Sequence, residues 1–260
     1  MPVLAVDAMH SCFSHALLEQ LVFYRHTVQN WNHTVLFFRR KSFDKYPHNK
    51  NLVNNGRYTG WIGKWIDYLI SPDEVYFEHL GARIPVQDVF FPVMQPTLWA
   101  DGRNYPGRPI LSVPPTLEQI RPPYDSLMQY VNGISMKNES LDKDSIWLIN
   151  RAAKYGRTMR MSLIHNLTKH VPSLRIITPE RSNPQKQIDD MRAAKMVIFR
   201  HGSILSNLIW VRPGTIAVDM DVRADRVKII DRLCELSGCR HVYVPYNDDN
   251  EIVKIVVSLL

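Results

Sequence analysis

The chain has 260 residues, and 45% of them are hydrophobic, so it can bury a sizeable core in one large domain or two smaller ones. The formal net charge is +7, which favours anionic partners such as nucleotide phosphates. Lys and Arg form no run of five or more, however, so the sequence does not indicate a nucleic-acid-binding tail. No stretch approaches the roughly 20 apolar residues of a membrane span.

The cysteines and the first residues bear on the expected compartment. Cys12, Cys234 and Cys239 have neither the spacing of a metal site nor that of a disulfide framework, so a reduced compartment is expected. The start of the chain lacks the charged and apolar regions of a signal peptide. We therefore expect a soluble cytoplasmic protein of viral or microbial kind, with a trimmed Golgi luminal domain as the alternative.

The first half of the chain alternates strands and helices before a proline-rich stretch. We expect strands at 3–6, 34–38, 75–77 and 89–91, and helices beginning at Ser14 and Trp61. Prolines are dense from Pro92 to Pro123, where we predict loops and no long regular element. A helix at 124–131 follows. The predicted domains are therefore 1–123 and 124–260.

The second half has a clearer α/β rhythm. Strands are predicted at 146–149, 174–177, 197–199, 215–218 and 241–244, with helices at 159–167, 185–194, 225–236 and 251–260. This alternation indicates a parallel sheet with helices on both faces, although the last helix could pack back on the first domain. Two such domains would leave a cleft lined by the carboxyl edges of both sheets, where α/β proteins bind ligands.

The most informative stretch runs from Met196 to Asp221. An apolar strand leads into the turn His201-Gly202-Ser203, and apolar residues at helical spacing follow until Pro213-Gly214. We predict that Ser203 caps this short helix, that Gly202 allows a close approach to the backbone, and that the helix-start amides suit a phosphate. An ordinary capped turn would have the same pattern.

Motifs around this turn resemble those of glycosyltransferase family 61. The family shows a strand ending in Arg, a second Arg, a Glu, a Gln before a helix, a block close to HGA-x-L-x-N, then PPG and a strand ending in Glu. The similar residues here are Arg151, Arg157 (or Arg160), Glu180, Gln187, His201, Gly202, Ser203, Leu205, Asn207, Pro213, Gly214 and Asp219. Cys12-Phe13-Ser14-His15 with Glu19 is similar to the family pattern N-x-x-H-x-x-x-D/E. Four residues depart from the family: Cys12 replaces Asn, Ser203 Ala, Arg212 Pro and Asp219 Glu.

The resemblance implies a GT-B architecture, in which two Rossmann-like domains face a central cleft. It also implies an inverting, metal-independent transfer of a sugar from a UDP-sugar to a hydroxyl group of a glycan or glycoprotein, with no further cofactor. Xylose is our first expectation for the sugar. The acceptor, the linkage and the oligomeric state are not specified by the sequence.

Residue roles follow from this reaction. Without a metal, cationic side chains and helix-start amides must stabilise the leaving diphosphate, and a guanidinium offers it two parallel donors. The predicted donor-binding residues are Arg151, Arg157, His201, Gly202, Ser203, Ser206, Asn207 and Asp219. Among them we expect Asp219 to bind the ribose hydroxyls. His15 is the predicted catalytic base, and Glu19 would orient or replace it.

Other functions fit parts of the same sequence. Arg200-His201-Gly202 is the short signature of a histidine phosphatase, in which His201 would be the nucleophile and His241 a partner. In that family the triplet follows the first strand of the domain, whereas here it lies near the end. A lectin-like module and a basic nucleic-acid binder are further alternatives. Asp219-Met220-Asp221 has the D-x-D form of a metal motif, but such triplets are frequent by chance and we predict no metal site.

Overall fold

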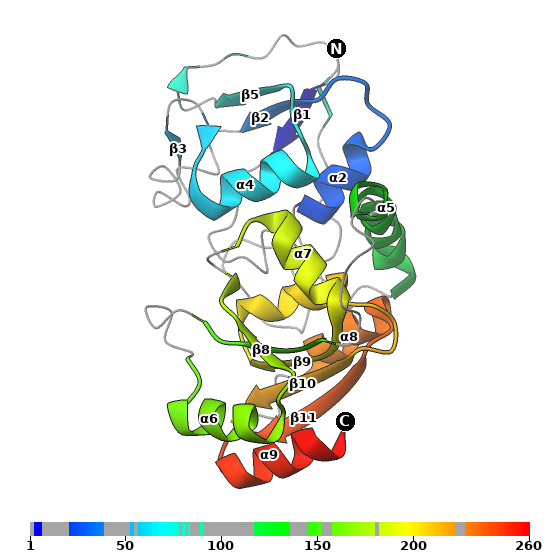
Figure 1. The fold of residues 1–260 in the computed structure, drawn as a ribbon. Helices are drawn as coiled ribbons and strands as arrows, with labels where there is room; N and C mark the ends of the chain where they lie inside the picture. Colours follow the sequence, from blue (N-terminus) through cyan, green and yellow to red (C-terminus); the bar gives the residue numbers. More distant parts are fainter. Residues whose placement is uncertain are drawn as a thin grey trace. The chain divides into compact units, whose positions relative to one another are not determined.

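The chain forms two compact α/β units, Met1–Gly133 and Ile134–Leu260, each with its own parallel sheet (Figure 1). The structure, a computed structural model, describes residues 3–6, 21–38, 53–54, 57–77, 80–81, 83, 89–90, 117–135, 145–151, 158–179, 182–221 and 227–260. The predicted α/β class is confirmed. The predicted boundary after residue 123 lies inside helix α5 (Leu117–Ser135).

The first unit is built on a four-stranded parallel sheet in the order β5-β2-β1-β6. Its described elements are β1 (Val3–Val6), α2 (Val22–Val28), β2 (Val35–Phe38), the hairpin strands β3 (Val53–Asn54) and β4 (Arg57–Tyr58), α4 (Gly60–Leu69), β5 (Glu74–Phe77), β6 (Val89–Phe90) and α5. All four residues of β2 are buried, as expected for a strand covered on both faces. The rings of Phe38, Tyr58 and Phe77 pack together at its end, with centroids 4.8–5.5 Å apart.

Helix α5 is longer than predicted. It starts at Leu117 and contains Pro122 and Pro123, so the prediction of no regular element is wrong for residues 117–123, while residues 92–116 lie outside the described part of the chain. Each proline removes one backbone N–H donor from the helix. The helix contacts its neighbours further along: the Arg25 guanidinium lies 3.8 Å from the centroid of the Tyr130 ring, and the Tyr130 hydroxyl donates to the Tyr68 carbonyl at 3.0 Å.

The second unit is a five-stranded parallel sheet in the order β11-β10-β9-β7-β8. Its elements are β7 (Ser145–Ile149), α6 (Met161–His170), β8 (Leu174–Ile177), α7 (Pro184–Ala193), β9 (Ala194–Arg200), the 3₁₀ helix η6 (Ser203–Trp210), β10 (Ile216–Asp221), α8 (Val227–Ser237), β11 (Arg240–Pro245) and α9 (Asp249–Ser258). The predicted alternation of strands and helices in this half is therefore confirmed, to within a few residues at the ends.

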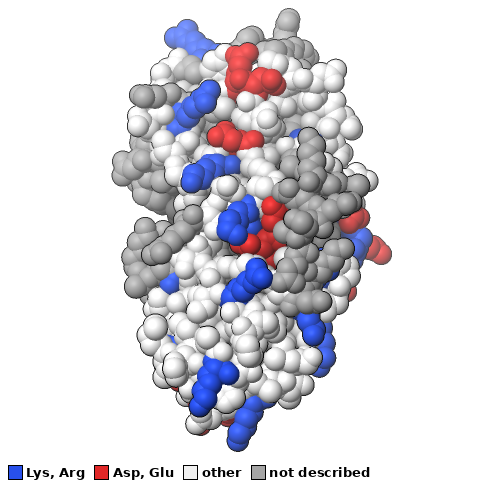
Figure 2. Space-filling model, viewed as in Figure 1, with Lys and Arg blue, Asp and Glu red and all other residues white. Residues whose placement is uncertain are grey.

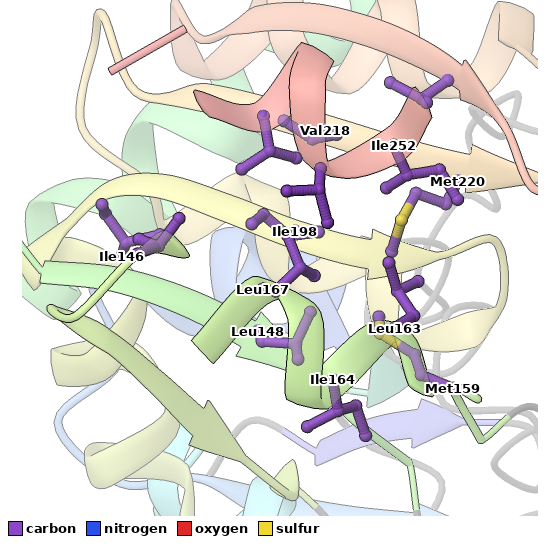
Figure 3. Packing of buried hydrophobic residues seen from close by; sticks show 14 of the residues in the cluster. Ile146, Leu148, Met159, Leu163, Ile164, Leu167, Ile198, Val218, Met220 and Ile252 are labelled. Carbon is purple, nitrogen blue, oxygen red and sulfur yellow. The ribbon is translucent and has the colours of Figure 1, made fainter. Parts of the chain in front are cut away.

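One face of this second sheet carries an extensive apolar core (Figure 3). Alternate strand residues, including Ile198, Val218 and Met220, point into it. Helix α6 contributes Leu163 and Leu167, and helix α9 contributes Ile252, Val253 and Val256. The last helix thus packs within its own unit. Since strand side chains alternate, residues such as Asp219 point to the opposite face.

The second unit also contains a disulfide, between Cys234 in α8 and Cys239 just before β11. The prediction that the cysteine spacing excludes a disulfide is wrong. Gly238 adopts φ +73°, which turns the chain sharply after the helix and brings the two thiols together, and spacing patterns of multi-disulfide frameworks do not describe such a local bridge. Cys12 lies outside the described residues. Of the helices that the structure describes, none combines the length and hydropathy of a membrane span.

Candidate functional site: the carboxyl edge of the second sheet

The strand register brings two predicted donor-binding residues to the same edge of the sheet. Ile149 in β7 lies beside Phe199 in the neighbouring strand β9. Arg151 and His201 each follow these partners by two residues, so they lie just beyond adjacent strand ends. Adjacent strands are about 4.8 Å apart, which allows both side chains to reach one ligand. This edge is where open α/β sheets bind their ligands.

The His201 turn is anchored by its main chain. The His201 N–H donates to the carbonyl of Met220 in β10 at 3.4 Å, and the Leu205 N–H donates to the Gly202 carbonyl at 3.0 Å. The prediction that Ser203 caps the following helix is wrong, because η6 begins at Ser203 and Gly202, which has no side chain, occupies the N-cap. The expected short helix is a 3₁₀ helix of eight residues. Its first amide groups therefore receive no side-chain cap.

Several predicted site residues are buried beneath this edge. Ser206 and Asn207 of η6 are 0% and 1% exposed. The Asn207 side-chain amide donates to Gln187 Oε1 at 3.4 Å, and the Gln187 amide donates to the Ser182 carbonyl at 3.2 Å. These contacts link η6 to helix α7. Asn207 and Gln187 therefore connect η6 to α7 and have a structural role next to the turn.

The side chains of His201 and Asp219 face each other. His201 Nδ1 lies 3.7 Å from Asp219 Oδ2, and the side chains are 9% and 1% exposed. Within the described part of the chain, neither carboxylate oxygen of Asp219 has a hydrogen-bond partner. A buried carboxylate without donors is costly, so this pair is an unusual polar feature among the described residues of the edge.

Two further arginines lie at this edge, on either side of one tyrosine. The guanidinium groups of Arg160 and Arg200 lie 4.3 and 4.2 Å from the centroid of the Tyr246 ring. Arg160 also pairs with Asp249 at 2.5 Å and donates to the Asn247 carbonyl at 3.3 Å. Arg200 donates to the Thr158 carbonyl at 3.0 Å, and no described carboxylate pairs with it. Arg160 is therefore neutralised, whereas Arg200 keeps a positive charge that an anion can use.

The comparison with protein families decides the identity of the chain. The family model Glycosyltransferase 61 matches residues 9–218. The chain belongs to glycosyltransferase family 61. It is therefore a glycosyltransferase, with a nucleotide sugar and an acceptor as substrates, and the predicted family resemblance is confirmed. No curated protein matches the chain.

The remaining site residues of this glycosyltransferase are not placed by the structure. His15, Glu19, Arg157 and Glu180 lie outside the described residues, as does the side chain of Ser203. The sequence reasoning, in turn, did not assign Arg200 to the donor site. Its position at the end of a strand next to that of Arg151 is the signal that could have indicated it, but the phosphatase signature Arg200-His201-Gly202 competed for the same residue.

The histidine-phosphatase alternative has no support in the glycosyltransferase. His241 lies beside Ala217, which lies beside Val197, so His241 is level with a residue four positions before His201. Four residues along a strand span roughly 13 Å. His241 Nδ1 is instead 2.7 Å from Asp231 Oδ1. The two histidines therefore do not form a catalytic pair.

The positive charge of the chain is not concentrated on the face seen in Figure 2. Lys and Arg side chains are dispersed there, with Asp and Glu between them.

Proposed function

We propose that this glycosyltransferase binds a UDP-sugar at the carboxyl edge of the second sheet and transfers the sugar, with inversion and without a metal ion, to a hydroxyl group of a glycan or glycoprotein. The observation that carries the proposal is the register that sets Arg151 and His201 beyond neighbouring strand ends, beside the start of η6. Each unit contains a parallel sheet with helices, and a GT-B architecture is built from two such α/β domains.

The proposed chemistry follows from the charge that develops on the leaving group. The acceptor oxygen forms a bond to the anomeric carbon as the bond from that carbon to the diphosphate oxygen breaks, and UDP leaves with an additional negative charge. Arg151 donates two parallel hydrogen bonds to phosphate oxygens, and the first amides of η6 add further donors. Arg200 adds a second cation at the same edge. His15, aided by Glu19, is the proposed base that removes the acceptor proton.

Calorimetric titration of Arg151→Ala with UDP tests this site. We expect the Kd for UDP to rise about 10- to 100-fold, because charge-assisted hydrogen bonds contribute about 1.5–3 kcal/mol. Arg240→Ala is the matched control, since Arg240 is exposed at the start of β11, at the opposite edge of the sheet, and should leave the Kd unchanged. Equal effects of the two substitutions would contradict the proposed site.

The donor sugar is tested with a panel of nucleotide sugars, first by thermal shift and then by release of UDP. We expect UDP-sugars to raise the melting temperature, with UDP-xylose turned over fastest. If no UDP species binds and a generic phosphomonoester is cleaved instead, the proposed reaction is wrong.

A further inference from the structure

The buried carboxylate of Asp219 needs a role that the proposed donor site does not yet give it. Asp219 lies in β10, which pairs with β9 through Phe199 and with β11 through Tyr243. The strand is thus held on both sides, and Asp219 is 1% exposed. A ribose hydroxyl could reach this carboxylate only if the packing around it opened.

The direction of the Asp219 side chain is set by its neighbours. Val218 and Met220 point into the apolar core between the sheet and helices α6 and α9 (Figure 3). Asp219 therefore points to the other face, where His201 Nδ1 lies 3.7 Å from its carboxylate. The His201 main chain is tied to the same strand through the Met220 carbonyl. Both members of the pair are consequently held by β10.

We infer that Asp219 is a positioning residue that acts through His201: its carboxylate accepts the Nδ1–H of a protonated imidazole, whose Nε2–H donates to a phosphate oxygen of the bound nucleotide sugar. The inference rests on the proposed function, and it replaces the ribose contact predicted for Asp219. A protonated imidazole donates from both ring nitrogens, so it can bridge two anionic groups. Closing the gap from 3.7 Å to a hydrogen bond of about 2.7–3.2 Å needs a movement of less than about 1 Å.

The geometry favours this role over a ribose contact for two reasons, one that concerns the Asp219 carboxylate and one that concerns the His201 ring. The carboxylate gains the hydrogen-bond donor that the described residues do not otherwise give it. The carboxylate then fixes which ring nitrogen faces the ligand, in the way that buried carboxylates orient histidines that bind metals or substrates. The charge of Asp219 then influences the phosphate through one side chain, without a direct contact that would repel the anion.

A double-mutant cycle separates this role from a direct ribose contact. Kd values are measured by calorimetry for UDP with the wild type, Asp219→Asn, His201→Ala and the double variant. We expect each single substitution to raise the Kd about tenfold, and the double variant to be no worse than His201→Ala, because the two residues act as one unit. Asp219→Glu, which keeps the carboxylate, should recover most of the affinity. Additive effects of the two substitutions would overturn the inference.

The ribose contact is tested with 2′,3′-dideoxy-UDP. If Asp219 acts through His201, loss of the ribose hydroxyls weakens binding by the same factor in the wild type and in Asp219→Asn. If Asp219 binds the ribose, the variant loses this discrimination and the inference is wrong. Circular dichroism of each variant verifies its folding.

A measurement on the wild type keeps the inference testable even if the variants do not fold. Nitrogen-15 NMR of histidine-labelled protein with bound UDP should show both His201 ring nitrogens protonated. A His201 without a proton on Nδ1 in the complex would overturn the inference, while the proposed UDP site would stand. Absence of UDP binding by the wild type would instead overturn the proposed function and, with it, this role of Asp219.

Discussion

The two arginines beside Tyr246 show how partners, rather than charge alone, decide what a residue can do. Arg160 is paired with Asp249 and with a backbone carbonyl, so its charge supports the junction between the start of α6 and the start of α9. Arg200 has one carbonyl acceptor and the tyrosine ring, and no described carboxylate. Of these two arginines, only Arg200 offers a ligand at the carboxyl edge a charge that no described carboxylate compensates.

Alanine substitution of each arginine should therefore have different effects. We expect Arg160→Ala to lower the free energy of unfolding by about 1 kcal/mol, through loss of a partly exposed ion pair and a cation–π contact, with little change in UDP affinity. Arg200→Ala should weaken UDP binding about 3- to 10-fold. Urea unfolding and calorimetry measure the two quantities. Weaker UDP binding by Arg160→Ala alone would show that the roles are reversed.

At the scale of single residues, the sequence indicated which residues follow strand ends, but it did not indicate which of the predicted site residues are buried. The positions of Arg151 and His201 at strand ends followed from the hydrophobic runs before them, and the register sets them beyond the ends of adjacent strands. The burial of Asn207 and Asp219 could not be predicted in the same way. It depends on η6 and α7 packing over the turn, and that packing involves residues distant in the sequence.

A disulfide joins helix α8 to the residue that precedes strand β11, and its contribution to stability can be measured. The disulfide between Cys234 and Cys239 has a sequence separation of 5. On the chain-entropy model, closing so small a loop contributes about 2 kcal/mol. We expect the double variant Cys234→Ala/Cys239→Ala to lose about this much unfolding free energy.

Reductant provides the control for the disulfide. Dithiothreitol should destabilise the wild type by a similar amount and leave the double variant unchanged. A wild type whose unfolding curve does not respond to the reductant would contradict a stabilising bond at this position.

Helix α7 carries a buried acid whose ionisation should make stability depend on pH. Burial raises the pKa of Asp190 above its ordinary value of 3.8, and the Lys186 ammonium, 2.9 Å away, opposes the shift. The folded state then holds a proton that the unfolded state releases, so stability falls as the pH rises from about 4 through the raised pKa. Asp190→Asn should reduce this fall.

Urea unfolding at pH 4 and pH 6 measures the effect of Asp190. The free energy of unfolding should decrease less between these pH values in Asp190→Asn than in the wild type. Asp189→Asn should reduce the fall only in part, because the Asp189 carboxylate adds to the rise in the Asp190 pKa that burial mainly causes. An identical pH response of the wild type and Asp190→Asn would exclude this source of pH dependence.

At the scale of elements, hydrophobic periodicity predicted where strands and helices occur, and local chemistry decided their exact form. The strands β7, β9 and β10 follow directly from apolar runs bounded by polar turns. Two features departed from the rules. Helix α5 continues through two prolines, and a positive φ at Gly238 accompanies the bridge between two cysteines.

The whole molecule consists of two α/β units, and the chain belongs to a family of glycosyltransferases. Two domains were predicted because strands and helices alternate on both sides of a proline-rich stretch. Residue 123, the predicted boundary, lies within α5, whose side chains contact α2 and α4 of the first unit.

The proposed reaction makes one prediction that concerns the complete enzyme. If Arg151, Arg200 and the imidazolium of His201 together stabilise the leaving UDP, a divalent cation has no charge left to neutralise there. We therefore expect release of UDP from the preferred UDP-sugar to change less than about twofold when EDTA is added, or when Mg²⁺ or Mn²⁺ is added afterwards. Because the compensation comes from side chains, Arg151→Ala should lower kcat in the presence of EDTA and of Mg²⁺ alike. Activity that EDTA abolishes and Mn²⁺ restores would mean that a bound cation carries the charge instead.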